Sequence, residues 1–244
     1  MKILCLDVET SPNTAYVWSL WKETIPLTRL IENSEVLCYS AKFLGDDHIY
    51  FDSIYHSSAE HMLEGIHALM DEADVLVHYN GNSFDIPCLN KEYLLYGMTP
   101  PAPSKQVDLL KVVRRNFRFT SNKLDHVSQR LGLGKKEETS FQLWIDCLNH
   151  NPTAWKQMEK YNKKDVILLE KLYKKLLPWI KGHPNHALYS AVSCCPNCGS
   201  GSFVKRGFSY TNTMKYQRYR CKDCGAWFRD RKAIKKEHDV YTSI

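Results

Sequence analysis

The N-terminal segment places the strongest constraint on the fold of this chain. An apolar run that begins at Ile3 contains Asp7 and is followed at once by Glu9. In an extended strand, residues two apart point to the same face, so the two carboxylates would lie side by side. Like charges at that distance repel, and a shared proton, a basic side chain or a divalent cation with oxygen ligands can neutralise them. The segment therefore predicts a buried strand whose carboxylate pair is either structural or part of a site.

Length and composition are those of a soluble globular protein. The chain has 244 residues, of which 43% are hydrophobic and 25% charged, enough for one substantial core and a small second module. No run approaches the roughly 18 apolar residues of a membrane span. The N-terminal apolar run is interrupted at Asp7, so it does not resemble a signal peptide. The odd total of nine cysteines argues against a disulfide framework. We expect a cytoplasmic protein that does not contact a membrane.

Hydrophobic periodicity predicts strands interleaved with helices, which indicates an α/β fold. A capping box formed by Ser57 and Glu60 predicts the start of one helix, and Gly97 is expected to close another. Strands are predicted at residues 3–8, 36–44, 48–54, 74–79 and 106–109, and helices at residues 57–72, 85–97, 109–117, 123–131 and 165–180.

Two later segments add carboxylates to the N-terminal pair. Asp85 ends a segment in which Asn80 and Phe84 precede it, and Asp165 follows Tyr161 by four residues, a spacing that puts both on one helix face. Four acids from three segments suit a phosphodiesterase site with two metal ions. In this order the segments resemble the three exonuclease motifs of the DEDD superfamily of 3'-5' exonucleases. They are most similar to the proofreading domain of family B DNA polymerases and its stand-alone relatives.

The resemblance covers roughly residues 1–180 and implies a ribonuclease H-like mixed sheet flanked by helices. It implies that two Mg²⁺ or Mn²⁺ ions support catalysis. It also implies that Tyr161, which places the chain in the tyrosine branch of the superfamily, orients the nucleophilic water. The residues implied as metal ligands are Asp7, Glu9, Asp85 and Asp165.

Further residues are candidates for contacts with the substrate. By the same analogy Asn80 contacts the substrate backbone, and Thr10 offers its backbone N–H or hydroxyl to the terminal nucleotide. The aromatic segment 16–21 includes Trp18, which could stack on unpaired bases at roughly 1 to 3 kcal/mol each. Basic residues also cluster at 111–118, where they form either a solvated helix face or phosphate contacts. Each of these residues has packing as its alternative role.

The C-terminal part of the chain carries two Cys-x-x-Cys-Gly knuckles separated by 22 residues. Four thiolates suit a closed, tetrahedral and structural Zn²⁺ site, whose binding would be coupled to folding of so small a segment. The segment resembles a zinc ribbon of the kind attached to some transposases. Cys194 precedes the first knuckle and is expected to be a bystander. The predicted zinc ligands are Cys195, Cys198, Cys221 and Cys224.

Positive charge is concentrated in the same part of the chain. Residues 181–244 hold 12 Lys/Arg and 4 Asp/Glu, for a formal charge of +8, whereas residues 1–180 hold 21 and 23, for −2. Such a distribution favours a polyanionic partner, most simply nucleic acid. Arg218 and Arg220 alternate with tyrosines, so they are candidates for contacts with phosphates. The alternative is that the aromatic residues form the small core of the ribbon.

These patterns predict an exonuclease domain at residues 1–182, a linker at 183–192, a zinc ribbon at 193–232 and a polar tail at 233–244. The leading hypothesis is a metal-dependent 3'-5' exonuclease that acts on nucleic acid by a two-metal mechanism, with the ribbon assisting binding. DNA is favoured over RNA, and single-stranded 3' ends are favoured as the substrate. Two other functions compete with it: a structure-specific endonuclease on the same fold, and an inactive nucleic-acid-binding adaptor.

Overall fold

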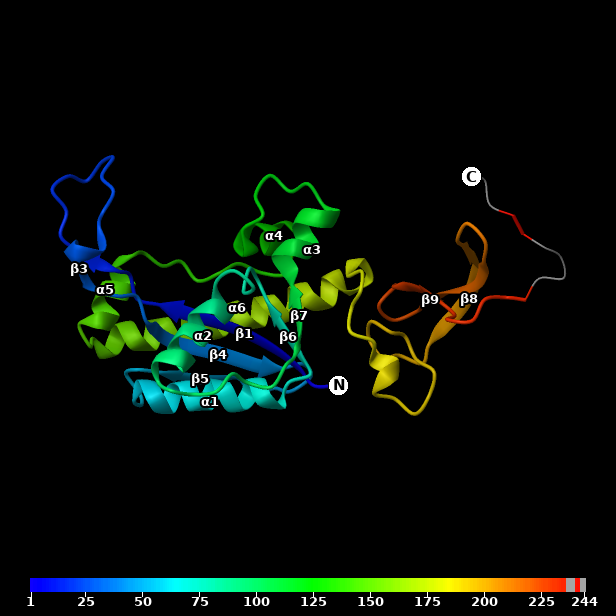
Figure 1. Ribbon diagram of the computed structural model, residues 1–244, viewed down its shortest axis with the longest axis horizontal. Coiled ribbons are helices and arrows are strands. Elements are labelled where there is room, and N and C mark those ends of the chain that lie inside the picture. The colour runs from blue at the N-terminus through cyan, green and yellow to red at the C-terminus, as the bar shows by residue number, and fades with distance from the viewer. Residues whose placement is uncertain (236–239, 242–244) are drawn as a thin grey trace. The chain divides into compact units, whose positions relative to one another are not determined.

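The computed structural model describes residues 1–235 and 240–241 (Figure 1). The described residues form two compact units, one of residues 2–172 and the other of the described residues from 173 onward together with Met1. The domain limits inferred from the sequence stay a prediction, and the predicted polar tail at 233–244 lies largely outside the described residues. Among the described helices, none combines the length and the apolar character that crossing a membrane requires.

The larger unit is built on a five-stranded mixed sheet with the order β5-β4-β1-β6-β7. The central strand β1 is antiparallel to β4 and parallel to β6. The outer pair β4 and β5 is antiparallel, whereas β6 and β7 are parallel. These strands are β1 (Ile3–Thr10), β4 (Val36–Phe43), β5 (Tyr50–Ser53), β6 (Val75–His78) and β7 (Lys105–Asp108). The predicted mixed α/β sheet is confirmed.

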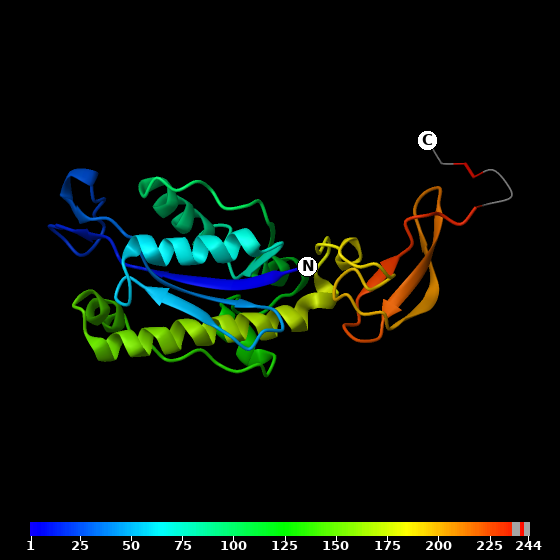
Figure 2. The same cartoon turned by 90° about the horizontal axis from the view of Figure 1, so that it is seen from below.

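Helices cover both faces of this sheet, with α1 and α2 on one side and α5 and α6 on the other (Figure 2). Side chains of β1 alternate between the two faces of the sheet. Leu4, Leu6 and Val8 point into the core that α1 and α2 cover. The residues between them, including Asp7, therefore face α6. The helices are α1 (Ala59–Glu72), α2 (Asp85–Leu95), α3 (Leu109–Asn116), α4 (Leu124–Arg130), α5 (Gln142–Leu148) and α6 (Pro152–Leu176).

Short elements complete the larger unit and lead into the smaller one. A two-stranded sheet of β2 (Thr14–Ala15) and β3 (Leu30–Glu32) follows β1, and a 3-10 helix at Leu27–Arg29 precedes β3. Two further 3-10 helices, at Leu177–Trp179 and His186–Leu188, follow α6.

Two helix starts differ from the predictions. The capping box of Ser57 with Glu60 is wrong, because the hydroxyl of Ser58 accepts the cap hydrogen bond from the N–H of His61 at 3.1 Å. The Ser57 hydroxyl instead donates to Asp52 at 2.8 Å. The last core helix begins at Pro152, not at residue 165, and α5 was not predicted. The choice between the adjacent residues Ser57 and Ser58 depends on the tertiary partner within reach, here Asp52.

The smaller unit contains an antiparallel sheet with the order β10-β9-β8. Its strands are β8 (Phe203–Tyr210), β9 (Lys215–Cys221) and β10 (Trp227–Arg229). Cys195, Cys221 and Ala226 are its buried centre, and Phe228 packs against them. So small a core supplies little apolar burial, which agrees with the expectation that a metal is needed for folding.

Candidate active site and the cysteine cluster

Three carboxylates converge between β1 and α6. Asp7 and Glu9 share the face of β1 that lies opposite its leucine core, and Asp165 lies on α6. One carboxylate oxygen of each residue lies within 4.8 Å of the others. Asp165 is buried, whereas Asp7 and Glu9 are partly exposed, so solvent reaches the cluster.

The fourth predicted acid, Asp85, is the first residue of α2 and lies outside this group of three. Its Oδ1 accepts a hydrogen bond of 3.0 Å from the backbone N–H of Val8, which ties the start of α2 to β1 between Asp7 and Glu9. The Asp85 side chain is buried, and its charge raises the pKa of both Asp7 and Glu9. The four acids thus interact electrostatically, although only three share the closest spacing.

The turn between β6 and α2 is held by two side chains. Asn80 has a φ of 72°, in the left-handed region that asparagine tolerates better than most residues, and its N–H donates to Oδ1 of Asp108 at 3.0 Å. The N–H of Gly81 donates to Nδ1 of His78 at 3.0 Å. A Cβ at position 81 would lie 2.4 Å from Cγ of His78, so only glycine fits there without a shift of the turn.

Burial and mutual repulsion raise the pKa values of these carboxyl groups. Burial, followed by the charge of Glu9, raises the pKa of Asp7 well above its ordinary value. Burial also raises the pKa of Glu9 to about 8 and that of Asp85 to about 6. The pKa of Asp165 is raised as well, again chiefly by burial. The four acids therefore need a cationic partner before all of them can be ionised near neutral pH.

Lys136, which no sequence pattern indicated, supplies one such cation. Nζ of Lys136 lies 2.6 Å from Oδ2 of Asp165 and 3.3 Å from the hydroxyl oxygen of Tyr161. Burial by itself lowers the pKa of this lysine, but the carboxylates of Asp165 and Asp7 outweigh that effect and the net pKa is raised. A basic side chain was one of the three ways of neutralising Asp7 and Glu9, and Lys136 provides it.

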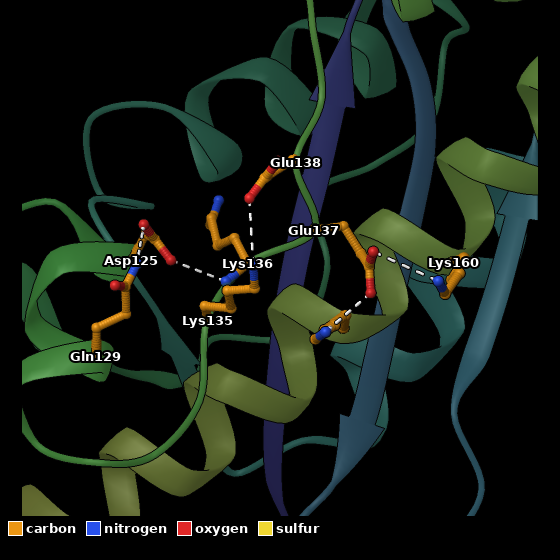
Figure 3. A network of polar contacts seen from close by, with 8 residues as sticks. Asp125, Gln129, Lys135, Lys136, Glu137, Glu138 and Lys160 are labelled. Carbon is orange, nitrogen blue, oxygen red and sulfur yellow. Dashed lines mark hydrogen bonds and ion pairs between the residues drawn. The ribbon is translucent and has the colours of Figure 1, made fainter.

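The segment around Lys136 has no regular secondary structure, and polar contacts fix it in place (Figure 3). The backbone N–H of Lys136 donates to Oδ1 of Asp125, on α4, at 2.8 Å. The next residue, Glu137, forms ion pairs with Lys164 at 2.8 Å and Lys160 at 3.4 Å, both on α6. The lysine is therefore tethered from both sides, and no periodicity in the sequence could have indicated this position.

The face of α6 that carries Asp165 presents two more polar side chains to the cluster. Tyr161 is buried, and burial raises the pKa of its hydroxyl, which therefore stays protonated at neutral pH. Asn162 was not predicted, although it lies three residues before Asp165 and so shares its face. Its Nδ2 donates to Oδ2 of Asp7 at 2.7 Å and holds that carboxylate against the helix.

The acid cluster fits a hard divalent cation. Such cations take carboxylate oxygens, and at the Mg²⁺–oxygen distance two ligands of one ion lie at most roughly 4 Å apart. The spacing within 4.8 Å requires only a small closure to meet that limit. Oδ1 of Asp165 is also buried without a hydrogen bond from the described residues. An orphaned buried acceptor beside two further carboxylates is a donor set suited to Mg²⁺ or Mn²⁺.

A cavity of about 530 Å³ adjoins the acid cluster. Its lining includes Asp7, Asn80 and Lys136 from the site itself, together with Arg114 and Lys123 from the α3–α4 region. Arg114 belongs to the basic cluster that the sequence left open between a solvated face and phosphate contact. Two carboxylates, Asp7 and Asp125, and three cations line the cavity, and the cations offer binding groups for a phosphate beside the acids.

The four predicted zinc ligands come together in the smaller unit. Their sulfur atoms all lie within 4.8 Å of one another, with 3.7 Å between Sγ of Cys195 and Cys224 and 3.6 Å between Cys198 and Cys221. Tetrahedral Zn²⁺ with Zn–S bonds of about 2.3 Å requires sulfurs about 3.8 Å apart, so the cluster fits zinc closely. Cys194 is buried but is not a member of this group.

Backbone amides also favour the thiolate form at one of these cysteines. Burial raises the pKa of the Cys221 thiol, but N–H groups of Cys224 and Asp223 outweigh it and bring the pKa down to about 7. A thiol with a lowered pKa gives up its proton to a metal ion more readily.

The remaining predicted nucleic-acid contacts are not members of the acid cluster. Thr10 is the last residue of β1 and is partly exposed. Trp18 is 88% exposed, in the segment between β2 and β3, where its N–H donates to Glu23. Arg218 and Arg220 are exposed residues of β9 and belong to the smaller unit.

Comparison with known proteins gives a family and a structural relative. A family model described as the RNase_H superfamily matches residues 4–177. The fold is similar to that of the family B DNA polymerase from the hyperthermophilic archaeon Pyrobaculum calidifontis, with a TM-score of 0.56 and 20% sequence identity. The likeness covers 72% of this chain and 24% of the polymerase. No curated protein matches the sequence.

Proposed function

Since the chain belongs to the RNase H superfamily, we propose that it is a divalent-metal-dependent 3'-5' exonuclease acting on nucleic acid. The observation that carries the proposal is the convergence of Asp7 and Glu9 from β1 with Asp165 from α6, with their oxygens within 4.8 Å. The buried Tyr161 lies on the same helix face as Asp165. The polymerase relative contributes support for the fold alone.

Asp7, Glu9 and Asp165 would hold the metal, and Asp85 would support it from the start of α2. When bound, Mg²⁺ or Mn²⁺ supplies charge stabilisation at the scissile phosphate and lowers the pKa of a bound water. Asn162 keeps the Asp7 carboxylate oriented through its 2.7 Å hydrogen bond. The protein thus contributes a preorganised set of oxygens whose repulsion is relieved by the cation they receive.

Tyr161 is proposed to orient the attacking water. Its raised pKa keeps the hydroxyl protonated, so the group can donate one hydrogen bond and accept another without losing its proton. Lys136, 3.3 Å from the same hydroxyl, limits the positions that the tyrosine can adopt. Water held in this way attacks in a defined direction, which is the positioning contribution that phosphodiester hydrolysis needs.

The cavity beside the acids is proposed to receive the 3' end of the strand. Asn80 lies in its wall, and Arg114 and Lys123 offer charges for the phosphates of the last nucleotides. Thr10 is kept as a candidate contact with the terminal nucleotide, and Trp18 as a candidate for stacking on an unpaired base. DNA is favoured as the substrate, and single-stranded 3' ends suit removal of one terminal nucleotide at a time.

We further propose that the four cysteines bind one structural Zn²⁺ and that the ribbon they stabilise assists substrate capture. The exonuclease domain would then cover residues 1–182, with the linker at 183–192 and the ribbon at 193–232. Two alternatives remain from the sequence, a structure-specific endonuclease and an inactive adaptor. The complete acid set and Tyr161 favour the exonuclease over both.

The test uses matched DNA and RNA oligonucleotides with a 5' label, incubated with the full chain in Mg²⁺ or Mn²⁺. A ladder of products shortened one nucleotide at a time from the 3' end is the expected result, and Asp165→Ala should abolish it. Discrete internal fragments would identify an endonuclease instead. Tight binding with no cleavage of either nucleic acid would identify an adaptor and overturn the proposal.

A further inference from the structure

The two faces of the three-stranded sheet in the smaller unit differ in chemistry. On one face Phe203, Tyr219 and Phe228 pack together, with ring centroids 5.3 to 5.5 Å apart. They lie on the side of Cys221, because Phe203 is paired with Cys221 in the strand register. Since residues alternate between faces, the opposite face carries a different set: Tyr216, Arg218, Arg220, Trp227 and Arg229.

The second face is exposed and joins cations to aromatic rings. Trp227 is 52% exposed, and the guanidinium carbon atoms of Arg218 and Arg220 lie 4.7 Å and 5.9 Å from its ring centroid. Arg229 lies over the ring of Tyr216, with its guanidinium carbon 3.9 Å from the centroid. These contacts hold the arginines above a surface whose aromatic rings remain partly open to solvent. We call these five residues the arginine–tryptophan face.

Among the residues that the structure describes, the positive charges on this face have no acidic partner. Arg218 and Arg229 are directly opposite each other in the register of β9 and β10, where like charges are destabilising. Within the described residues, none of the arginines of the face forms an ion pair. The two nearby acids have other partners: Asp223 accepts a hydrogen bond from Ser200, and Asp230 accepts one from Tyr219. A cluster of uncompensated cations indicates a polyanion as the missing partner.

A cavity of about 500 Å³ lies beside the same face. Its lining includes the cations Arg206, Arg220 and Lys222, with Asp223 as the one acid. Arg220 both lines this cavity and contacts Trp227, so the cavity and the exposed ring are neighbours. A phosphate placed among the three cations would bring an attached base within reach of the ring.

We propose that the arginine–tryptophan face binds an unpaired nucleic-acid strand, with a base stacked on Trp227 and its phosphates at Arg206, Arg220 and Lys222. In a duplex the base faces are already occupied by neighbouring bases, so an exposed tryptophan favours a single strand, and phosphates supply the matching charge. The inference deepens the proposed function. It rests on that function only in taking the bound strand to be the substrate.

The experiment measures binding by the full chain carrying Asp7→Asn, which prevents hydrolysis during the measurement. Fluorescence anisotropy with a short labelled single strand, and with the matching duplex, should show tighter binding of the single strand. Adding Trp227→Ala should weaken single-strand binding by roughly 5- to 150-fold, the effect of losing one stacked base. Trp227→Phe should restore much of it. Replacing Arg206 and Arg220 together by Ala should reduce the slope of log affinity against log salt by roughly 0.7 per residue.

Lys205→Ala is the matched control, because Lys205 is paired with Tyr219 and lies on the opposite face of the same sheet. It removes one charge and should weaken binding less than Arg220→Ala does. Zinc content checks that each variant retains the ribbon, and the double arginine variant decides the matter if Trp227→Ala loses its metal. Equal binding of duplex and single strand, or affinity and salt slope unaffected by the tryptophan and arginine changes, would overturn the inference. A chain that binds through this face but never cuts would refute the exonuclease alone.

Discussion

Nζ of Lys136 lies 2.6 Å from Oδ2 of Asp165, one of the three clustered acids. The lysine side chain is 27% exposed and that of Asp165 is fully buried, so the pair is screened only in part by water. Lys136 thus neutralises Asp165 at one oxygen, while Oδ1 of the same carboxylate is buried without a hydrogen bond from the described residues. The chain has a resident cation beside its acids, and a metal ion that binds there must compete with that charge.

Lys136→Met should destabilise the metal-free protein, because the buried carboxylates lose their cation. Breaking a buried ion pair costs up to about 3 to 5 kcal/mol, and proton uptake by the acids will reduce the loss at low pH. Added Mg²⁺ or Mn²⁺ should raise the melting temperature of this variant more than that of the unmodified chain. Thermal melts across a metal titration measure both effects. Lys135→Met is the control, since Lys135 pairs with the exposed Glu138 and not with the cluster. Identical metal responses in both variants would contradict the competition.

Asp7→Asn should abolish hydrolysis and at the same time stabilise the metal-free protein. The amide removes a metal ligand, and the loss of several kcal/mol of transition-state stabilisation corresponds to roughly a thousandfold or more in rate. It also removes a charge that burial and Glu9 disfavour, so the melting temperature at neutral pH should rise. Single-turnover cleavage and a thermal melt on the same preparation test the pair of outcomes. A lower melting temperature would show that the repulsion is not significant.

The metal-free protein should lose stability as the pH rises. The pKa of Glu9 is raised from 4.5 to about 8, and that of Asp85 from 3.8 to about 6. At a pH between the ordinary and the raised pKa of either group, the folded state therefore binds more protons than the unfolded state. Stability therefore falls with pH across roughly pH 4 to 8. Added Mg²⁺ or Mn²⁺ should flatten this dependence, because the cation replaces the protons. Melting temperatures at several pH values, with and without added metal, measure the slope. A melting temperature that rises toward pH 8 without metal would contradict the expectation.

Asp108→Ala should lower activity through the turn that carries Asn80. One oxygen of Asp108 accepts hydrogen bonds from the N–H groups of Asn80 and Leu110, both at 3.0 Å, and caps α3. Its removal should cost about 0.5 to 2 kcal/mol of stability and release Asn80 from its left-handed conformation. Cleavage kinetics, compared with the melting temperature, separate the two effects. Ser58→Ala is the control. It removes the cap of α1 and should cost a similar amount of stability, but it leaves the turn between β6 and α2 unchanged.

Cys198→Ser should release the zinc, whereas Cys194→Ser should retain it. Cys198 is one of the four sulfurs within 4.8 Å, and Cys194 is not. Elemental analysis of the purified variants should give one zinc per chain for the unmodified protein and for Cys194→Ser, and none for Cys198→Ser. Zinc retained in Cys198→Ser would show that another ligand set binds the metal.

The sequence by itself determined the features that depend on local periodicity. Spacing of two on a strand placed Asp7 and Glu9 on one face, and spacing of four on a helix did the same for Tyr161 and Asp165. Each Cys-x-x-Cys turn likewise placed its own two sulfurs on the same side of the turn. In each case the geometry of a single regular element, or of one short turn, fixes the relation between the residues.

Only the tertiary structure decided which distant segments meet. Lys136 comes from an irregular segment, so no periodic pattern connects it with Asp165, and its position depends on tethers to α4 and α6. The opposition of Arg218 and Arg229 likewise follows from the register of two strands, not from either strand alone. Contacts of this kind arise from packing between elements, where the chain between two residues places almost no restriction on the distance that separates them.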